Sequence, residues 1–248
     1  MPATPAWPPR SAPRLFVDGE LTLGQVRTLD GNAAHYLVQV MRVSPGDAVI
    51  LCDNATGEWA ARVTEAGKRR VTLSVDQHLR EREDAPDLWL CIAPIKKPHF
   101  DMVLEKATEL GAARVVPVLT RRCVVDKVNV DRAQTIVTEA AEQCARTALP
   151  QVAPLVTLPR LLAYWPADRA LFHADEQGGS AALESFAATR GQPAAILIGP
   201  EGGFDDAERE AVRAVSSARA VSLGPRILRA ETAAIAALSL WMAAEGDW

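Results

Sequence analysis

The sequence has few cysteines, and their spacing is not typical of a metal site or a redox motif. The four thiols include no C-x-x-C pair, and the four histidines are scattered over separate segments without metal-ligand spacing. With 248 residues, 48% of them hydrophobic, the chain has ample material for packed cores. We therefore expect reduced thiols, no disulfide and no metal site. The cysteines are Cys52, Cys91, Cys123 and Cys144, and the histidines are His35, His78, His99 and His173.

A long hydrophobic run is also missing. The longest apolar stretch, Thr232 to Ala244, is too short to span a bilayer. The proline-rich start of the chain lacks the apolar region of a signal peptide. These absences predict a cytoplasmic protein without a membrane partner, in which residues 1–13 form a flexible arm.

An excess of positive charge is the third absence. The formal net charge is -4 and the sequence pI is about 5.7, which argues against a protein that coats nucleic acid through bulk charge. Up to Arg82 there are 10 basic and 9 acidic residues, whereas the remainder has 17 basic and 22 acidic ones. Any contact with RNA must therefore be local.

The first third of the chain shows short runs of β-type residues separated by turn residues. One helical segment interrupts them, because Ala34, Leu37, Val38 and Met41 recur at helical spacing before the break that begins at Ser44. This pattern predicts a small β-barrel with one helix over residues 14–82. The predicted strands are 15–17, 48–51, 59–63 and 71–75.

The charged stretch 80–87 contains a proline and has no apolar face, so we place a domain boundary there, with the second domain at 83–248. In this domain strand-like runs alternate with helical stretches, which indicates a parallel sheet covered by helices. One such helix has its apolar face between Phe100 and Leu110, and Gly111 is placed to cap it. The predicted strands are 88–95, 114–119, 170–173, 194–198 and 220–223.

Residues 196–206, Ile-Leu-Ile-Gly-Pro-Glu-Gly-Gly-Phe-Asp-Asp, predict a buried strand, a glycine-rich turn and a helix capped by Asp205 or Asp206. Ligands tend to bind beyond the carboxyl ends of such strands, although a plain strand-to-helix connection also uses glycines. The turn lacks the Lys-Ser/Thr pair of a P-loop and the G-x-G-x-x-G spacing, and Glu201 stands where a polyphosphate needs donors. ATP and NAD are therefore disfavoured.

A second strand and turn lead through Leu223 to Thr232 into a helix that is apolar on nearly every side and must be buried. Functional side chains of this segment must then lie in the turn. Arg226 and Arg229 within it are either surface charges or RNA contacts.

These two turns resemble the Ile-Gly-Pro-Glu-Gly-Gly-Phe and Leu-Gly-x-Arg-Ile-Leu-Arg-x-Glu-Thr-Ala motifs of the ribosomal RNA small subunit methyltransferase E (RsmE) family. The resemblance extends upstream through 96–97, 106–111, 120–122 and 139–146, and into the first domain at 14–17 and 35–47. It covers nearly the whole chain after the arm. The sequence departs from the family pattern at Cys123 and Cys144, where serine is common.

The resemblance implies a SPOUT-class fold, in which an α/β domain threads a deep trefoil knot and follows a PUA-like RNA-binding barrel. It implies methylation of uridine N3 in small-subunit (16S) ribosomal RNA or an assembling small subunit, with S-adenosylmethionine as donor and a homodimer as the working unit. Two alternatives stay open: a methyltransferase of this class acting on another RNA, and a non-catalytic RNA-binding protein of the same fold.

The resemblance assigns the donor to the two turns, where main-chain groups around Gly199, Leu223 and Leu228 would bond the adenine edge. The expected cofactor-binding residues are Leu197, Ile198, Gly199, Pro200, Glu201, Gly202, Gly203, Phe204, Leu223, Gly224, Ile227, Leu228, Arg229 and Thr232.

Methylation of the imide N3 also requires removal of its proton. The candidates for managing this proton and the resulting negative charge are Arg229, Glu231, Arg121 and Arg122, with the arginines suited to stabilising an anion. The general base stays open. Glu201 and Glu142 have structural alternatives, a bond to local amides for the first and an i, i+4 pair with Arg146 for the second.

A phosphate-binding patch is expected in the first domain, although a basic turn is often only a solvated loop. The expected RNA-binding residues are Arg14, Arg42, Lys68, Arg69, Arg70 and Arg146.

Overall fold

The structure is a computed structural model that describes residues 7–175 and 177–248. The chain divides into two compact units, the first formed by Met1–Asp84 with Ala141–Ala148 and the second by Ala85–Ala140 with Leu149–Trp248. The return of Ala141–Ala148 to the first unit is not visible in the sequence, because it depends on contacts between distant segments. The part of the predicted flexible arm at 1–6 lies outside the described residues.

The first unit is built on a five-stranded sheet in the order β1-β3-β4-β5-β2, in which β1 pairs with β3 in parallel and the other pairs are antiparallel. The predicted strands and helix are present, and the helix is a short α-helix that continues into a π-helical turn, η1. β2 was not predicted, because the apolar residues of this edge strand, Val26 and Leu29, do not alternate with polar ones. The elements are β1 (Arg14–Phe16), β2 (Val26–Asp30), α1 (Gly31–His35), η1 (Tyr36–Val40), β3 (Ala48–Cys52), β4 (Glu58–Ala66) and β5 (Arg70–Arg80).

The core of the first unit lies between this sheet and the helical segment. Val71, Leu73 and Val75 alternate along β5 and are fully buried, as a sheet with one covered face requires. They pack with Leu37 of η1 and Leu51 of β3 in the same cluster. Burial of each such side chain contributes roughly 1.5 to 3 kcal/mol.

The second unit contains a parallel sheet in the order β11-β13-β10-β12-β6-β7-β8, with β9 paired to β7 beside it. The predicted α/β class is therefore confirmed. Its elements are β6 (Leu88–Ile92), α2 (Lys97–Glu109), β7 (Arg114–Leu119), α3 (Val130–Gln143), β8 (Gln151–Val152), β9 (Val156–Thr157), α4 (Leu158–Ala163), β10 (Ala170–Ala174), β11 (Ser180–Ala181), α5 (Ala182–Ala187), β12 (Ala194–Ile198), α6 (Asp206–Arg213), β13 (Ala218–Ser222) and α7 (Ala230–Glu245).

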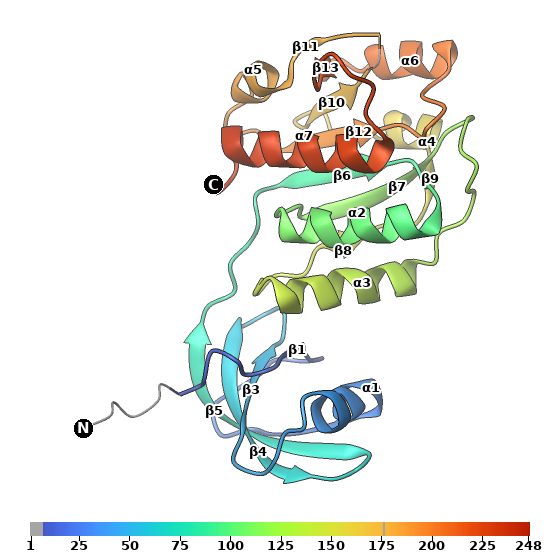
Figure 1. Ribbon diagram of the computed structural model, residues 1–248. Helices are drawn as coiled ribbons and strands as arrows, with labels where there is room; N and C mark the ends of the chain where they lie inside the picture. The colour runs from blue at the N-terminus through green and yellow to red at the C-terminus, as the bar shows by residue number, and fades with distance from the viewer. Residues whose placement is uncertain (1–6, 176) are drawn as a thin grey trace. The chain divides into compact units, whose positions relative to one another are not determined.

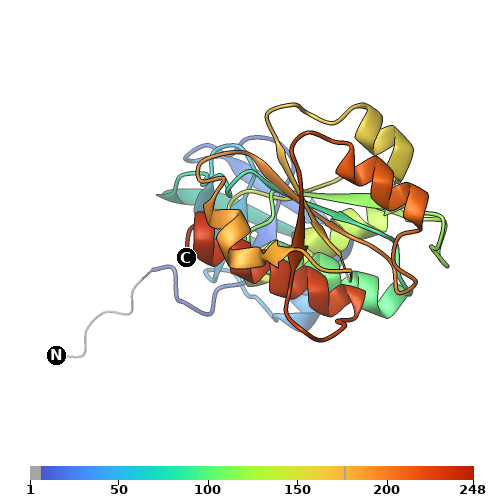
Figure 2. The same ribbon diagram turned by 90° about the horizontal axis from the view of Figure 1, so that it is seen from above.

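Helices cover both faces of this sheet (Figures 1 and 2). α2, α3, α5 and α7 pack on one face, and α4 and α6 pack on the other. Phe100, Val103, Leu104 and Ala107 of α2 are buried, as their helical spacing predicts. Gly111 ends that helix with a φ of 89°, a conformation that favours glycine.

The order of the strands brings three loops to one edge of the sheet. β10 lies between β12 and β13, and all three run in parallel. Their carboxyl ends therefore meet, which places the segments after Ala174, Ile198 and Ser222 side by side. Among the described helices, none combines the length and apolar character needed to cross a membrane.

Candidate active site

The glycine-rich turn after β12 and the second motif turn after β13 form walls of one pocket of about 320 Å³ at the carboxyl ends of these strands. This volume falls in the range of small-molecule sites. Most of the residues that the motifs single out line it. They are Ile198, Gly199, Pro200, Glu201, Gly203, Phe204, Leu223, Gly224, Ile227 and Leu228.

The turn after β12 needs its glycines for two different reasons. A Cβ on Gly199 would lie 3.0 Å from Cε2 of Phe204, whose ring is buried below the turn. Gly203 has a φ of 66°, which a residue with a side chain rarely adopts. Asp205 then caps α6 in a capping box with Glu208, so the first of the two predicted cap residues is the one used.

A third wall comes from the segment after β10, which the sequence analysis did not single out. Asp175, Gln177 and Gly178 line the pocket there, together with Arg209 of α6. The rule that ligands bind beyond the carboxyl ends of parallel strands, applied to the predicted strand 170–173, is the signal that points to this segment.

Asp175 is the buried anchor of this wall. Its Oδ2 accepts a hydrogen bond from Nη2 of Arg213 at 2.9 Å, and its Oδ1 accepts one from the backbone N–H of Gln177 at 3.0 Å. Nη1 of Arg209 lies 3.8 Å from the same carboxylate. Two cations and a backbone donor thus compensate the buried negative charge.

His173 precedes this wall on β10 and is buried. Its Nε2 lies 3.9 Å from Oδ2 of Asp175. Burial lowers the pKa of the imidazole, and the nearby carboxylate of Asp175 opposes this shift only in part. The ring is therefore held neutral at physiological pH.

Arg121 and Arg122 follow β7 and attach to the glycine-rich turn from outside the pocket. Nη1 of Arg121 donates to Asp205 at 2.8 Å, and Nη1 of Arg122 donates to the carbonyl oxygen of Gly202 at 2.8 Å. The backbone N–H of Glu208 and then the guanidinium of Arg121 lower the pKa of the Asp205 carboxyl. The structure thus places both arginines as supports of the turn, with exposed side chains.

Four of the expected cofactor-binding residues do not line the pocket. Leu197 is buried in the core on the α4 side of the sheet, and Gly202 faces Arg122. Arg229 is the N-cap residue of α7 and is exposed, as is Thr232 in the first turn of that helix.

Glu231, also in the first turn of α7, is buried and lies against α2. Its Oε1 is 3.2 Å from Nδ1 of His99, whose side chain is 39% exposed. The sequence alone does not predict this pairing, because His99 and Glu231 lie far apart along the chain. The pair lies at the start of α7, directly after the turn that ends at Arg229.

Two side chains at the mouth of the pocket are exposed. Glu201 has no hydrogen-bond partner in the part of the chain that the structure describes, so its carboxylate does not bond local amides. Ile227 is 88% exposed although it lines the pocket. Both are therefore available to a ligand.

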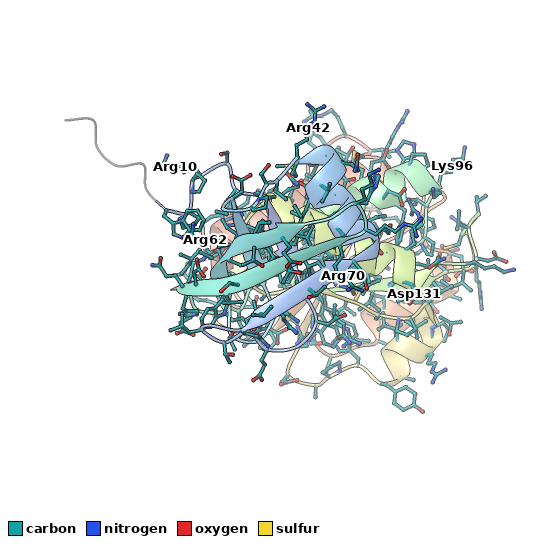
Figure 3. The ribbon with its side chains drawn as sticks, turned by 90° about the horizontal axis from the view of Figure 1, so that it is seen from below. Arg10, Arg42, Arg62, Arg70, Lys96 and Asp131 are labelled. Carbon is teal, nitrogen blue, oxygen red and sulfur yellow. The ribbon has the colours of Figure 1, made fainter. Side chains whose placement is uncertain are left out.

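In the first unit the expected RNA contacts lie in different surroundings. Arg14 is bound to Glu58, and Nε of Arg146 donates to the carbonyl oxygen of Ala148 at 3.1 Å. Lys68, Arg69 and Arg70 are exposed around the β4–β5 turn. Arg42 is exposed with a φ of 56° and comes from a separate segment, so Arg42 and Arg70 do not converge (Figure 3).

Glu142 binds the backbone of β1. Its carboxylate accepts a hydrogen bond from the backbone N–H of Phe16 at 2.8 Å, within the first unit. Cys123, at one departure from the family pattern, lies with its sulfur 3.2 Å from the hydroxyl of Thr120. Outside residues 1–6 and 176, no group of three acidic, histidine or cysteine side chains is arranged to hold a metal ion.

Comparison with known proteins relates this pocket to a known class. A model of the RNA methyltransferase domain matches residues 82–242, and a model of the RNA methyltransferase PUA domain matches residues 29–76. The chain is 34% identical to the ribosomal RNA small subunit methyltransferase E of Synechocystis over 91% of its own length and 76% of the relative's. These matches place the chain among the RNA methyltransferases that carry a PUA domain.

Two solved structures of methyltransferases share this fold. A methyltransferase from Legionella pneumophila with bound S-adenosylmethionine is 29% identical with a TM-score of 0.86, and the RsmE protein of Neisseria gonorrhoeae bound to S-adenosylmethionine is 28% identical with a TM-score of 0.85. Each alignment covers 96% of this chain and 99% of the other. The chain belongs to the ribosomal RNA small subunit methyltransferase E family. The predicted combination of an α/β domain and a small PUA-like unit is confirmed.

Proposed function

We propose that this protein transfers the methyl group of S-adenosylmethionine to N3 of a uridine in small-subunit ribosomal RNA. The observation that carries the proposal is the convergence of the turns after Ile198 and Ser222 on a single pocket. These are the two segments whose sequence carries the family motifs. Cytoplasmic location, a homodimer and a knotted chain path belong to the same proposal.

The pocket suits the proposed donor. Ile198, Leu223, Leu228 and Ala233 give it apolar surface for a purine ring, and the bare backbone at Gly199 permits main-chain groups to approach a ligand closely. The buried guanidinium of Arg209 supplies a positive charge that suits the carboxylate of the methionine moiety. When bound, the donor supplies an electrophilic methyl carbon on its sulfonium.

The residues of the chain supply alignment and proton removal. Holding two reactants in line is worth several kcal/mol of the barrier. Arg229, exposed between two pocket residues, stabilises the negative charge that develops on the uridine oxygens. Arg121 and Arg122 act indirectly, because they fix the turn that carries Gly202.

The imide proton passes to His99 in this proposal. Glu231 is buried against Nδ1 of His99, so it serves to orient the ring and not to meet the substrate. Nε2 is then the nitrogen that accepts the proton from N3 and later releases it to water. In this role His99 acts as the general base of the reaction.

Methylation of defined RNAs tests the function. The purified protein with isotope-labelled donor is incubated with naked small-subunit rRNA, assembled small subunits and tRNA, and the nucleosides are then identified by mass spectrometry. The expected result is 3-methyluridine at one position in small-subunit rRNA. A methylated tRNA, or a different methylated nucleoside, would overturn the assignment, and absence of donor binding in calorimetry would show a non-catalytic RNA-binding protein.

A further inference from the structure

A second groove, of about 400 Å³, lies at the other end of the parallel sheet. Its floor is formed by Trp89, the second residue of β6, and Arg114, the first residue of β7. The pocket described above follows the last residues of β12 and β13, so the two sites lie at opposite ends of the strands. Arg160 and Leu161 of α4 line the groove, so it lies on the α4 side of the sheet, whereas α7 packs on the other face. We refer to it as the α4 groove.

Two guanidinium groups and a second indole surround Trp89 at the floor of the α4 groove. The guanidinium carbon of Arg169 lies 3.9 Å from the centre of the Trp89 ring, and that of Arg114 lies 4.6 Å from it. Trp165 meets the same ring edge-on at 6.4 Å. An indole ring attracts a cation that lies near its face, and the outer face of a guanidinium held there can take another planar group.

The two arginines near Trp89 differ in whether an acidic partner neutralises their charge. Nη2 of Arg169 donates to the carboxylate of Asp87 at 2.7 Å, and Nη1 donates to the carbonyl oxygen of Ala194 at 2.9 Å. Arg114 has no ion-pair partner among the residues that the structure describes, and its Nε is buried without a hydrogen bond. Arg114 is thus an uncompensated cation at the floor of an open groove.

The rim adds a second cation and a free aromatic ring. Arg160 of α4 is exposed and has no ion-pair partner in the described part of the chain. Tyr164, at the end of α4, is 82% exposed. Among residues 7–175 and 177–248, no acidic side chain lines the groove, although the protein as a whole has a net charge of -4.

We infer that the α4 groove binds a nucleotide of single-stranded RNA, as a contact of the substrate remote from the methyl-transfer pocket. The phenol of Tyr164 and the face of Arg114 offer stacking surfaces to a base, and the guanidinium groups of Arg114 and Arg160 attract its phosphates. An acidic peptide could pair with Arg114 and Arg160, but its carboxylates would offer no planar ring to stack on Tyr164. The choice of RNA as the nucleic acid rests on the proposed function.

The test uses the full-length protein and a fluorescein-labelled single-stranded RNA of small-subunit rRNA sequence. The variants are Arg160→Gln, Tyr164→Ala and their combination, all at exposed positions whose loss leaves the fold intact. Matched controls are Arg219→Gln, an exposed arginine of β13, and Trp248→Ala, a 65% exposed aromatic residue at the chain end. Fluorescence anisotropy gives the Kd at several salt concentrations.

The double variant should bind RNA about tenfold more weakly, since stacking and phosphate contacts both contribute. The slope of log Kd against log salt should also fall by about 0.7, the contribution of one phosphate contact on a single strand. The controls should match the wild type, and donor affinity in calorimetry should not change.

An unchanged Kd and salt slope in the double variant would overturn the inference. It would also be overturned if a poly-glutamate peptide displaced the RNA at lower concentration than unlabelled RNA does. Failure of the proposed function gives a different result, because the wild type would then bind RNA through this groove but transfer no methyl group.

Discussion

Nδ1 of His99 lies 3.2 Å from Oε1 of Glu231, which joins the amino-terminal ends of α2 and α7. The glutamate is buried and the histidine is partly exposed, so the pair has one inner and one outer member. A carboxylate this close to one ring nitrogen resembles sites in which a carboxylate orients a catalytic imidazole. The pair thus places an imidazole beside the turn that carries Arg229.

Replacement of His99 by Ala should slow methyl transfer about a hundredfold near neutral pH, the usual range for loss of a general base. The deficit should shrink as the pH rises, because the uridine imide then loses its proton to water without help. Single-turnover rates at saturating donor, measured across the pH range, give this result. Calorimetry should show unchanged donor affinity. A deficit of the same size at every pH would show that His99 has only a structural role.

Replacement of Gly224 by Ala should weaken donor binding at least tenfold. Gly224 has a φ of 110° and no neighbouring atom that a Cβ would meet, so the effect comes from backbone strain alone. Such strain costs about 1 to 3 kcal/mol and distorts the pocket wall. Gly191 is the matched control, since it has a φ of 78° and equally open space but does not line the pocket.

Thermal unfolding and calorimetry separate the two glycine variants. Both Gly224→Ala and Gly191→Ala should lower the melting temperature, whereas only the first should change the Kd for the donor. Equal donor affinities in the two variants would mean that the turn after β13 does not contact the donor.

The features that the sequence predicts well are local ones. The buried strand before Gly199 and the cap at Asp205 follow from runs of apolar residues and from turn chemistry within a few positions. The two motif turns could be assigned to one ligand only through the family resemblance. Their convergence depends on the strand order, which places β10 between β12 and β13 and which no local pattern contains.

The features that the sequence analysis missed depend on residues far apart along the chain. Asp175 meets Arg209 and Arg213 from a different element, and His99 meets Glu231 across two helices. A charged residue in a sequence shows neither its burial nor its partner. For the same reason Arg121 and Arg122 could be predicted as important but not as supports of the glycine-rich turn.

Replacement of Asp205 by Ala should lower the melting temperature at neutral pH, because the first turn of α6 loses its cap. Asp205→Asn keeps a cap acceptor but loses the charge that interacts with Arg121, so its effect should be smaller. The pKa of the Asp205 carboxyl is lower in the folded state than in the unfolded chain. Its negative charge therefore stabilises the fold at any pH above the ordinary pKa of aspartate, and this stabilisation is lost as the pH falls through the pKa of the folded state. The difference in melting temperature between the wild type and Asp205→Asn should therefore disappear below about pH 4. A gap that stays constant on acidification would contradict the role of the charge.

His173 should make the second unit sensitive to mild acid. Burial lowers its pKa below the ordinary value of 6.5, with Arg213 and Arg209 acting in the same direction and Asp175 against it. The unfolded chain therefore takes up a proton at a higher pH than the folded one, so stability present above pH 6.5 is lost as the pH falls.

The variant His173→Phe should remove this part of the pH dependence. Both ring nitrogens of His173 lack hydrogen-bond partners within the described residues, so an apolar ring of similar size sacrifices no hydrogen bond. Calorimetric melting between pH 7 and pH 5 should show a smaller decline for the variant than for the wild type. His35→Gln, a change at an exposed histidine of the first unit, should decline like the wild type. If His173→Phe declines as steeply as the wild type, the loss on acidification comes from other groups, and the buried ring is protonated as readily in the folded chain as in the unfolded one.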